Sequence, residues 1–197
     1  MQIKLPLILC ALILALPHCS DSTESVHHRG GGDFANGGPQ IERLAAYDSR
    51  RDRLEMESLP QLEEIDANLL RLFQMIQKKD LQSLPEMVHP GDGVFIDLKA
   101  HRSIPELKED LEEQNGYFEQ YYLNTGKLQK ATGDDSQLSI HDLLEKNEVI
   151  KTEYYLEPGG TQVEVKFTLS STPDQSFRLN NAVFIKRDNH WYFLQLL

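Results

Sequence analysis

The part of the chain that follows Asn147 alternates between apolar and polar side chains. The clearest run is apolar at Val163, Val165, Phe167 and Leu169 and polar at the residues between them. A period of two predicts a strand with one buried and one solvated face. Similar apolar runs cover residues 149–156, 179–186 and 191–196, with turn residues between them, the last being Asp188-Asn189. Short connections favour antiparallel neighbours, so these runs predict an antiparallel meander.

The part before Asn147 has helical spacing instead. Apolar residues three and four apart between Leu62 and Ile76 predict an amphipathic helix, which Ser58 and Gln61 begin with a capping box. Shorter helices are expected over 80–88 and from Ser103 and Ser139, and a first strand over 94–98. Helices followed by strands, without βαβ alternation, predict an α+β fold with N-terminal helices packed on one face of a curved antiparallel sheet.

The amino-terminal residues 1–18 are expected to be a signal peptide. A single Lys4 precedes an apolar run over residues 5–16, which is too short to cross a hydrocarbon core of about 30 Å. The run ends in Leu16-Pro17-His18-Cys19, which resembles a bacterial lipobox except that His18 replaces the usual small residue. The resemblance implies lipidation of Cys19 and a membrane anchor at the cell envelope. The alternative is a secreted, soluble protein with an unmodified Cys19.

The next two segments are expected to lie outside the globular domain. Residues 19–40 are rich in Gly, Ser and His with few apolar side chains, which predicts a flexible lipoprotein tether. Residues 41–58 carry many charges and few apolar residues, which predicts an exposed helix or a spacer. The folded domain is therefore expected over residues 59–197.

Composition excludes several classes of function. The 197 residues hold 20 basic and 31 acidic side chains, a net charge of −11 that argues against nucleic acid as a partner. Two cysteines exclude a disulfide framework and a four-cysteine zinc site. The sequence lacks a nucleophile elbow, a His-Glu-x-x-His motif and a dinucleotide fingerprint, so no cofactor and no metal are expected.

The order of the expected elements is similar to that of the NTF2-like superfamily. A long amphipathic helix, a short one that ends in Val88-His89-Pro90-Gly91-Asp92-Gly93-Val94, a strand, a capped helix and a closing hairpin around Trp191 carry this resemblance. It covers residues 59–197, with a longer segment than usual at 115–147. The resemblance implies a cone-shaped sheet with a cavity between sheet and helices and a homodimer formed through the sheet. Members include isomerases, dehydratases and binding domains, so function stays open.

The candidate catalytic residues are His89, Asp97 and His101. An aspartate that holds one imidazole tautomer lets the other ring nitrogen take a proton, so Asp97 and a histidine could form a general base with its orienting group. The plainer interpretation is that these residues flank a turn and end a helix. Among the clustered aromatic residues, Tyr121 and Tyr154 are the candidates for a ligand cavity, and core packing is the alternative.

Three hypotheses follow from these patterns. The first is an envelope-anchored, non-catalytic module that binds a small apolar ligand or another protein. The second is a small cofactor-free enzyme, of isomerase or dehydratase type, that uses the Asp/His pair in the cone. The third is a structural dimeric spacer with a filled cavity.

Overall fold

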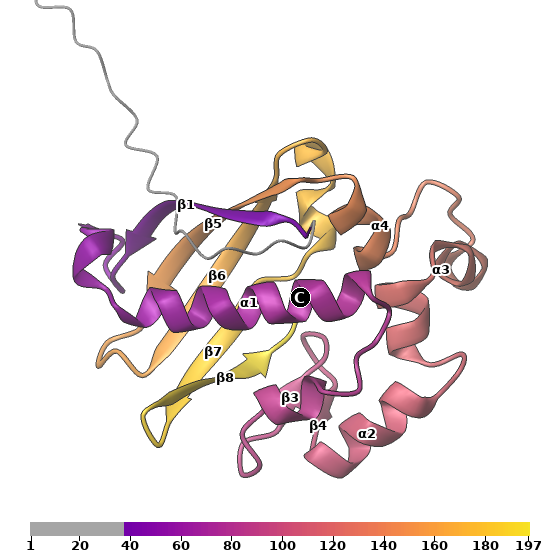
Figure 1. The fold of residues 1–197 in the computed structure, drawn as a ribbon, viewed down its shortest axis with the longest axis horizontal. Coiled ribbons are helices and arrows are strands. Elements are labelled where there is room, and N and C mark those ends of the chain that lie inside the picture. Colours follow the sequence, from indigo (N-terminus) through magenta and orange to yellow (C-terminus); the bar gives the residue numbers. More distant parts are fainter. Residues whose placement is uncertain (1–37) are drawn as a thin grey trace, which may run out of the picture. The chain divides into compact units, whose positions relative to one another are not determined.

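Eight strands form one curved sheet in the computed structural model, which describes residues 38–197 (Figure 1). The strands are β1 (Gln40–Tyr47), β2 (Arg53–Leu54), β3 (Val94–Phe95), β4 (His101–Arg102), β5 (Val149–Leu156), β6 (Gln162–Leu169), β7 (Ala182–Arg187) and β8 (His190–Gln195). Their order in the sheet is β2-β1-β5-β6-β7-β8-β3-β4. The expected meander β5 to β8 is confirmed as antiparallel. The sheet as a whole is mixed, however, because β1 pairs parallel with β5 and β3 pairs parallel with β8.

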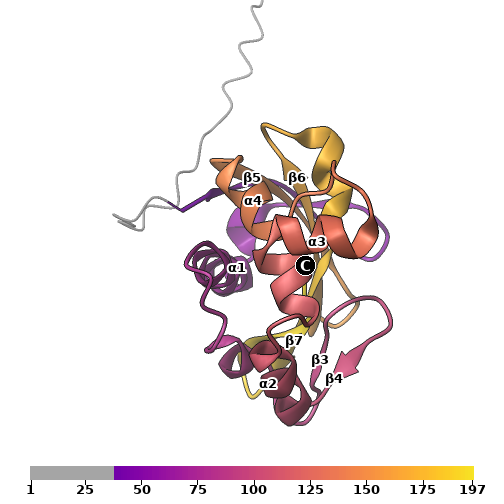
Figure 2. The ribbon, with the colours of Figure 1, turned by 90° about the vertical axis from the view of Figure 1, so that its right-hand side faces the viewer.

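The helices confirm the α+β class. They are α1 (Gln61–Gln77), α2 (Ile104–Glu112), α3 (Thr125–Thr132) and α4 (Ile140–Glu145), with 3-10 turns η1 (Met56–Ser58), η2 (Leu84–Met87) and η4 (Pro173–Arg178) and a π-helical turn η3 (Phe118–Leu123). Helix α1 runs across one face of the sheet (Figures 1 and 2). Its expected apolar stripe, from Leu62 to Ile76, is fully buried. The signal segment, Cys19 and the tether up to residue 37 lie outside the described residues.

The core lies between α1 and the meander. The alternating residues of β6, from Val163 to Leu169, are buried, as the period of two predicts. The rings of Phe184 and Phe193 meet across β7 and β8 with centroids 4.3 Å apart. The turn between these two strands has φ of 48° at Asp188 and 68° at Asn189, positive values that suit a tight hairpin.

Residues 41–58 are not a helix or a spacer. Most of the segment is β1, β2 and η1, and β1 is an integral strand of the sheet beside β5. A register shift between Arg43 and Ala45 leaves Leu44 exposed and turns Ala45 and Ala46 into buried positions. This bulge interrupts the alternation of apolar and polar residues that would indicate a strand. The partner strand β5 also lies about a hundred residues later in the chain, so the local sequence of residues 41–58 predicted the wrong structure.

The helix starts predicted at Ser103 and Ser139 are confirmed. Ser103 and Glu106 form the expected capping box of α2, and Ser139 caps α4. The capping box expected at Ser58 is absent, because its hydroxyl donates to Glu55 O and α1 begins after Pro60. The expected helix over 80–88 is only the 3-10 turn η2, and the strand over 94–98 is only β3. Within residues 115–147, Asn124 caps the helix α3.

Candidate functional site

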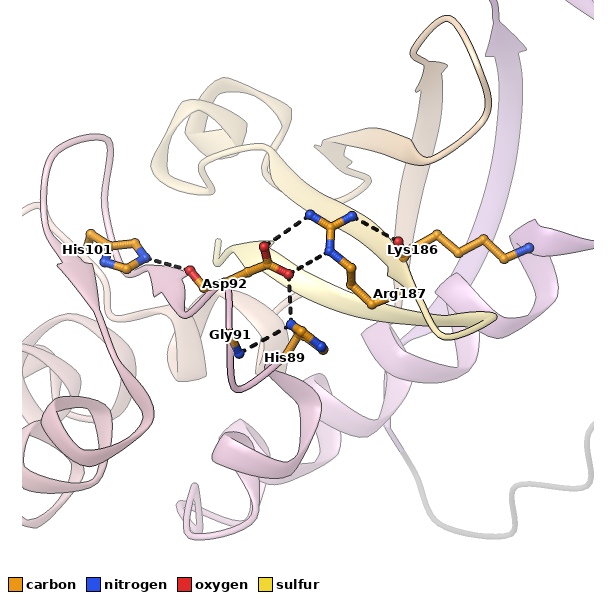
Figure 3. A network of polar contacts seen from close by, with 6 residues as sticks. All are labelled: His89, Gly91, Asp92, His101, Lys186 and Arg187. Carbon is orange, nitrogen blue, oxygen red and sulfur yellow. Dashed lines mark hydrogen bonds and ion pairs between the residues drawn. The ribbon is translucent and has the colours of Figure 1, made fainter.

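Two of the expected catalytic residues, His89 and His101, lie on either side of Asp92 (Figure 3). Nδ1 of His89 is 2.8 Å from Oδ2 of Asp92, and Nε2 of His101 donates to the main-chain oxygen of Asp92 at 2.8 Å. Since a carboxylate only accepts, Nδ1 of His89 carries the proton in this contact. The N–H of Gly91, 3.3 Å from the same nitrogen, cannot donate to it at the same time.

The carboxylate of Asp92 is held mainly by Arg187 at the end of β7. Nε of Arg187 donates to Oδ2 at 2.9 Å and Nη2 donates to Oδ1 at 3.0 Å, a bidentate pair. Hydrogen bonding to Arg187 first, and the neighbouring His89 to a smaller extent, lower the pKa of Asp92. A carboxylate held ionised in this way is a weak base. The network therefore fastens the turn before β3 to β7.

Asp97 does not join this network. Its Oδ1 accepts from the N–H groups of Lys99 and Ala100, both at 2.6 Å, and so closes the turn between β3 and β4. Across residues 38–197, no hydrogen bond or ion pair joins Asp97 to His101, whose ring packs edge-on against Phe95. The expected pair of base and orienting group is therefore not formed, because the backbone of the turn occupies Asp97.

A pocket of about 300 Å³ lies elsewhere, between the turn after β3, the π-helical turn η3, the start of α4 and the 3-10 turn η4. It is lined by Asp97, Tyr117, Tyr121, Leu138, Ile140, Phe177, Arg178, Asn180 and Leu197. Four of these residues belong to the long segment 115–147, which therefore builds one wall. A second pocket of about 280 Å³ lies between the end of α1 and η3, and neither pocket contains His89 or His101.

The wall of the first pocket is a stack of phenol rings. The rings of Tyr117 and Tyr121 are 4.8 Å apart and tilted by 23°. Burial, and secondarily the charge of Asp97, raise the pKa of Tyr117 to about 12. Its hydroxyl therefore stays protonated at neutral pH and can donate a hydrogen bond. Behind the wall, Tyr122 is fully buried and donates to the main-chain oxygen of Leu197 at 3.1 Å.

Only one of the two expected cavity residues reaches this pocket. Tyr121 lines it and is 36% exposed. Tyr154 is fully buried on the core face of β5, where its hydroxyl donates to Asp66 of α1. It is therefore a core residue and lines neither pocket.

The sequence patterns did not predict the charged residues of the Asp92 network or of the pocket. Asp92 was named only within the segment 88–94 that carries the NTF2-like resemblance, and its partner Arg187 is 95 positions away. Arg178, the cation of the pocket, stands in a polar stretch after a turn signal, and no local pattern distinguishes it. The only large apolar residue in that polar stretch, Phe177, was the available signal.

A third cluster has groups that could ligate a metal ion. His141, Asp142 and Glu145 of α4 offer ligand atoms within 4.8 Å of one another. However, Nδ1 of His141 is 2.8 Å from Asp142 Oδ1, and Asp142 Oδ2 accepts from the hydroxyl of Thr125 at 2.6 Å. The cluster thus satisfies its own polar groups and fastens α3 to α4.

No family model, no curated protein and no solved structure matches this chain. Within residues 38–197, no helix is both long enough and apolar enough to cross a membrane. The function must therefore be argued from the site itself.

Proposed function

We propose that this chain is an exported, lipid-anchored module that binds a small, largely apolar ligand in the pocket lined by Tyr121 and Phe177. One observation carries the proposal. Of the four large apolar side chains exposed in the described residues, Tyr121 and Phe177 line this pocket and Leu98 follows the lining residue Asp97. Phe177 is 78% exposed and Leu98 is 73% exposed. Two of these exposed apolar side chains at one pocket favour a binding site there.

The proposal includes a domain of the NTF2-like type. It is supported by the curved sheet, by α1 on one of its faces and by the closing hairpin of β7 and β8. The homodimer through the sheet stays a prediction. The residues it would cover are the half-buried apolar side chains that point away from the core on these two strands: Val183, Ile185, Tyr192 and Leu194.

A non-catalytic role is favoured over the enzyme alternative. The enzyme hypothesis needs an aspartate and a histidine in contact within a pocket. His89 contacts the Asp92 carboxylate, but neither residue lines either pocket. Of the expected catalytic residues only Asp97 reaches a pocket, and one of its oxygens is bonded to the backbone. A binding module needs only the pocket and its rim.

Indole is a suitable probe of the pocket, because it is flat, largely apolar and uncharged. Titrated into the isotope-labelled full chain, it is expected to shift NMR resonances of residues 117–121 and 177–180. Tyr121→Ala should weaken binding, whereas Tyr47→Ala, which removes an aromatic ring from β1 outside the pocket, should not. Indole at its solubility limit without shifts at these residues would exclude the proposed site.

The anchor has a separate test. Expressed in a bacterium, the mature protein should begin at Cys19 and carry the mass of a lipid, and Cys19→Ala should abolish both the added mass and membrane association. A mature protein without added lipid, or one whose processing is insensitive to globomycin, would leave a secreted binding module.

A further inference from the structure

The pocket contains an arginine that forms no ion pair within the described residues, although its charge helps to lower the pKa of Asp134. Arg178 ends η4, and its Nε is shielded from solvent without a hydrogen-bond partner. Among residues 38–197, the other guanidinium nitrogens of Arg178 also form no hydrogen bond or ion pair. Buried donors are almost always partnered in folded proteins, and charged ones most of all. An arginine that lines a pocket without a hydrogen-bond partner in the described residues favours an acceptor supplied by a ligand.

We propose that this acceptor is the carboxylate of a small aromatic or aliphatic acid, bound with its anionic group on Arg178 and its apolar body against Tyr121 and Phe177. This inference rests on the proposed function, because it names the ligand class of the same pocket. A guanidinium presents a planar fork of N–H donors that matches the two oxygens of a carboxylate.

The charges of the pocket favour a singly charged anion. Arg178 is its only cationic lining residue, and Asp97 is its only acidic side chain. These two charges cancel, so a bound carboxylate adds one negative charge to the lining. A phosphate dianion would add two beside Asp97, and like charges in partly buried surroundings repel.

The remaining lining fits the rest of such a ligand. Leu138, Ile140 and Phe177 provide apolar surface, and the stacked rings of Tyr117 and Tyr121 provide a flat wall. The protonated hydroxyl of Tyr117 adds a neutral donor. A volume of about 300 Å³ is at the lower end for ligand pockets, so a single or fused ring with a short acidic side chain is the appropriate size.

Three probes with the same ring separate charge from shape: indoleacetate is an anion, indoleacetamide is neutral and tryptamine is a cation. With the full chain at neutral pH, indoleacetate is expected to bind about tenfold more tightly than indoleacetamide, as one charge-assisted hydrogen bond implies. Tryptamine is expected to bind most weakly.

Arg178→Gln should remove the preference for the anion while indole itself still binds. Arg50→Gln removes one equally charged but highly exposed guanidinium on the surface and should leave the preference intact.

The outcomes distinguish this inference from the proposed function. Equal binding of the anion and the amide, or a preference for tryptamine, overturns the carboxylate ligand but leaves a binding pocket. A preference that survives in Arg178→Gln overturns the role of Arg178. If none of the probes, indole included, shifts the pocket resonances, both proposals fail. Should Arg178→Gln not fold, Arg178→Lys, which keeps the charge but loses the planar fork, should reduce the preference; an unchanged preference there also contradicts the inference.

Discussion

Tyr154 on β5 donates its hydroxyl to the carboxylate of Asp66 on α1, 88 positions earlier in the chain. The same carboxylate accepts from Nε of Arg43 on β1 at 2.5 Å. Burial raises the pKa of Asp66, although Tyr154 and Arg43 both favour its charged form. One carboxylate therefore joins the first strand, the long helix and the first strand of the meander.

Replacing Tyr154 with Phe tests this junction. The ring and its packing stay, but the buried carboxylate loses a donor and Thr152, which donates to the hydroxyl at 3.0 Å, loses an acceptor. We expect the free energy of unfolding to fall by about 2 kcal/mol at neutral pH, measured by urea denaturation. Tyr155→Phe, on the opposite face of the same strand, is the control and should change it by less than about 0.5 kcal/mol. Equal losses in the two variants would argue against the junction.

The effect of Tyr154→Phe should also depend on pH. The hydroxyl stabilises the charged form of Asp66, so its removal should raise the Asp66 pKa further above its ordinary value of 3.8. A carboxyl whose pKa is higher in the folded state makes the fold less stable as pH rises through the interval between the unfolded and folded values. The two proteins should therefore differ least in acid and most at neutral pH. An NMR titration of the Asp66 carboxyl carbon checks the direction, and a stability difference independent of pH would contradict it.

Asp92→Asn tests the second junction, between the turn before β3 and the end of β7. The pKa of Asp92 is lowered, chiefly by Arg187, so its stabilisation is present above the unfolded value of 3.8 and is lost as pH falls through the folded value. Because the pair is partly exposed, we expect a loss of about 1 kcal/mol at neutral pH that disappears in acid. Thermal unfolding across pH measures it. Asp174→Asn, an exposed carboxylate without an ion pair in the described residues, should have little effect at any pH.

These two junctions show what sequence patterns could and could not predict. Periodicity identified α1 and the meander, and the Ser103 capping box identified α2, because each signal lies within one element. Asp66 with Tyr154, and Asp92 with Arg187, are pairs that exist only after distant elements have packed. The pocket was missed for the same reason: its lining comes from the β3–β4 turn, η3, α4 and η4, and only Asp97 and Tyr121 among the expected residues reach it.

Gly93 is a position where backbone and space both exclude a side chain. Its φ is +67°, and a Cβ would collide with the main-chain oxygen of Arg102 and lie 2.8 Å from the His101 ring. Gly93→Ala is expected to lower the free energy of unfolding by about 3 kcal/mol, through backbone strain and displacement of β4. Gly159→Ala is the matched control, because its φ is also positive but open space surrounds it. The control should cost about 1 kcal/mol, measured by denaturant unfolding, and equal costs would exclude the collision as the cause.

The strand β1 leads to the last prediction. A chain that begins at residue 59, where sequence patterns place the start of the domain, lacks the strand that covers the edge of β5 and lacks the Arg43 partner of Asp66. Exposed strand edges promote aggregation, and a buried carboxylate without its partner is strongly destabilising. Compared with a chain that begins at residue 38, we expect it to lose about 3 kcal/mol or more and to aggregate on heating, as shown by urea denaturation and light scattering.

A third chain separates the two causes of this loss. Arg43→Gln in the chain that begins at residue 38 keeps β1 paired with β5 and removes only the ion pair with Asp66. It should lose part of the stability without aggregating, because the edge of β5 stays covered. If the chain that begins at residue 59 instead proved as stable and as soluble as the longer one, β1 would be a dispensable addition to a sheet that ends at β5.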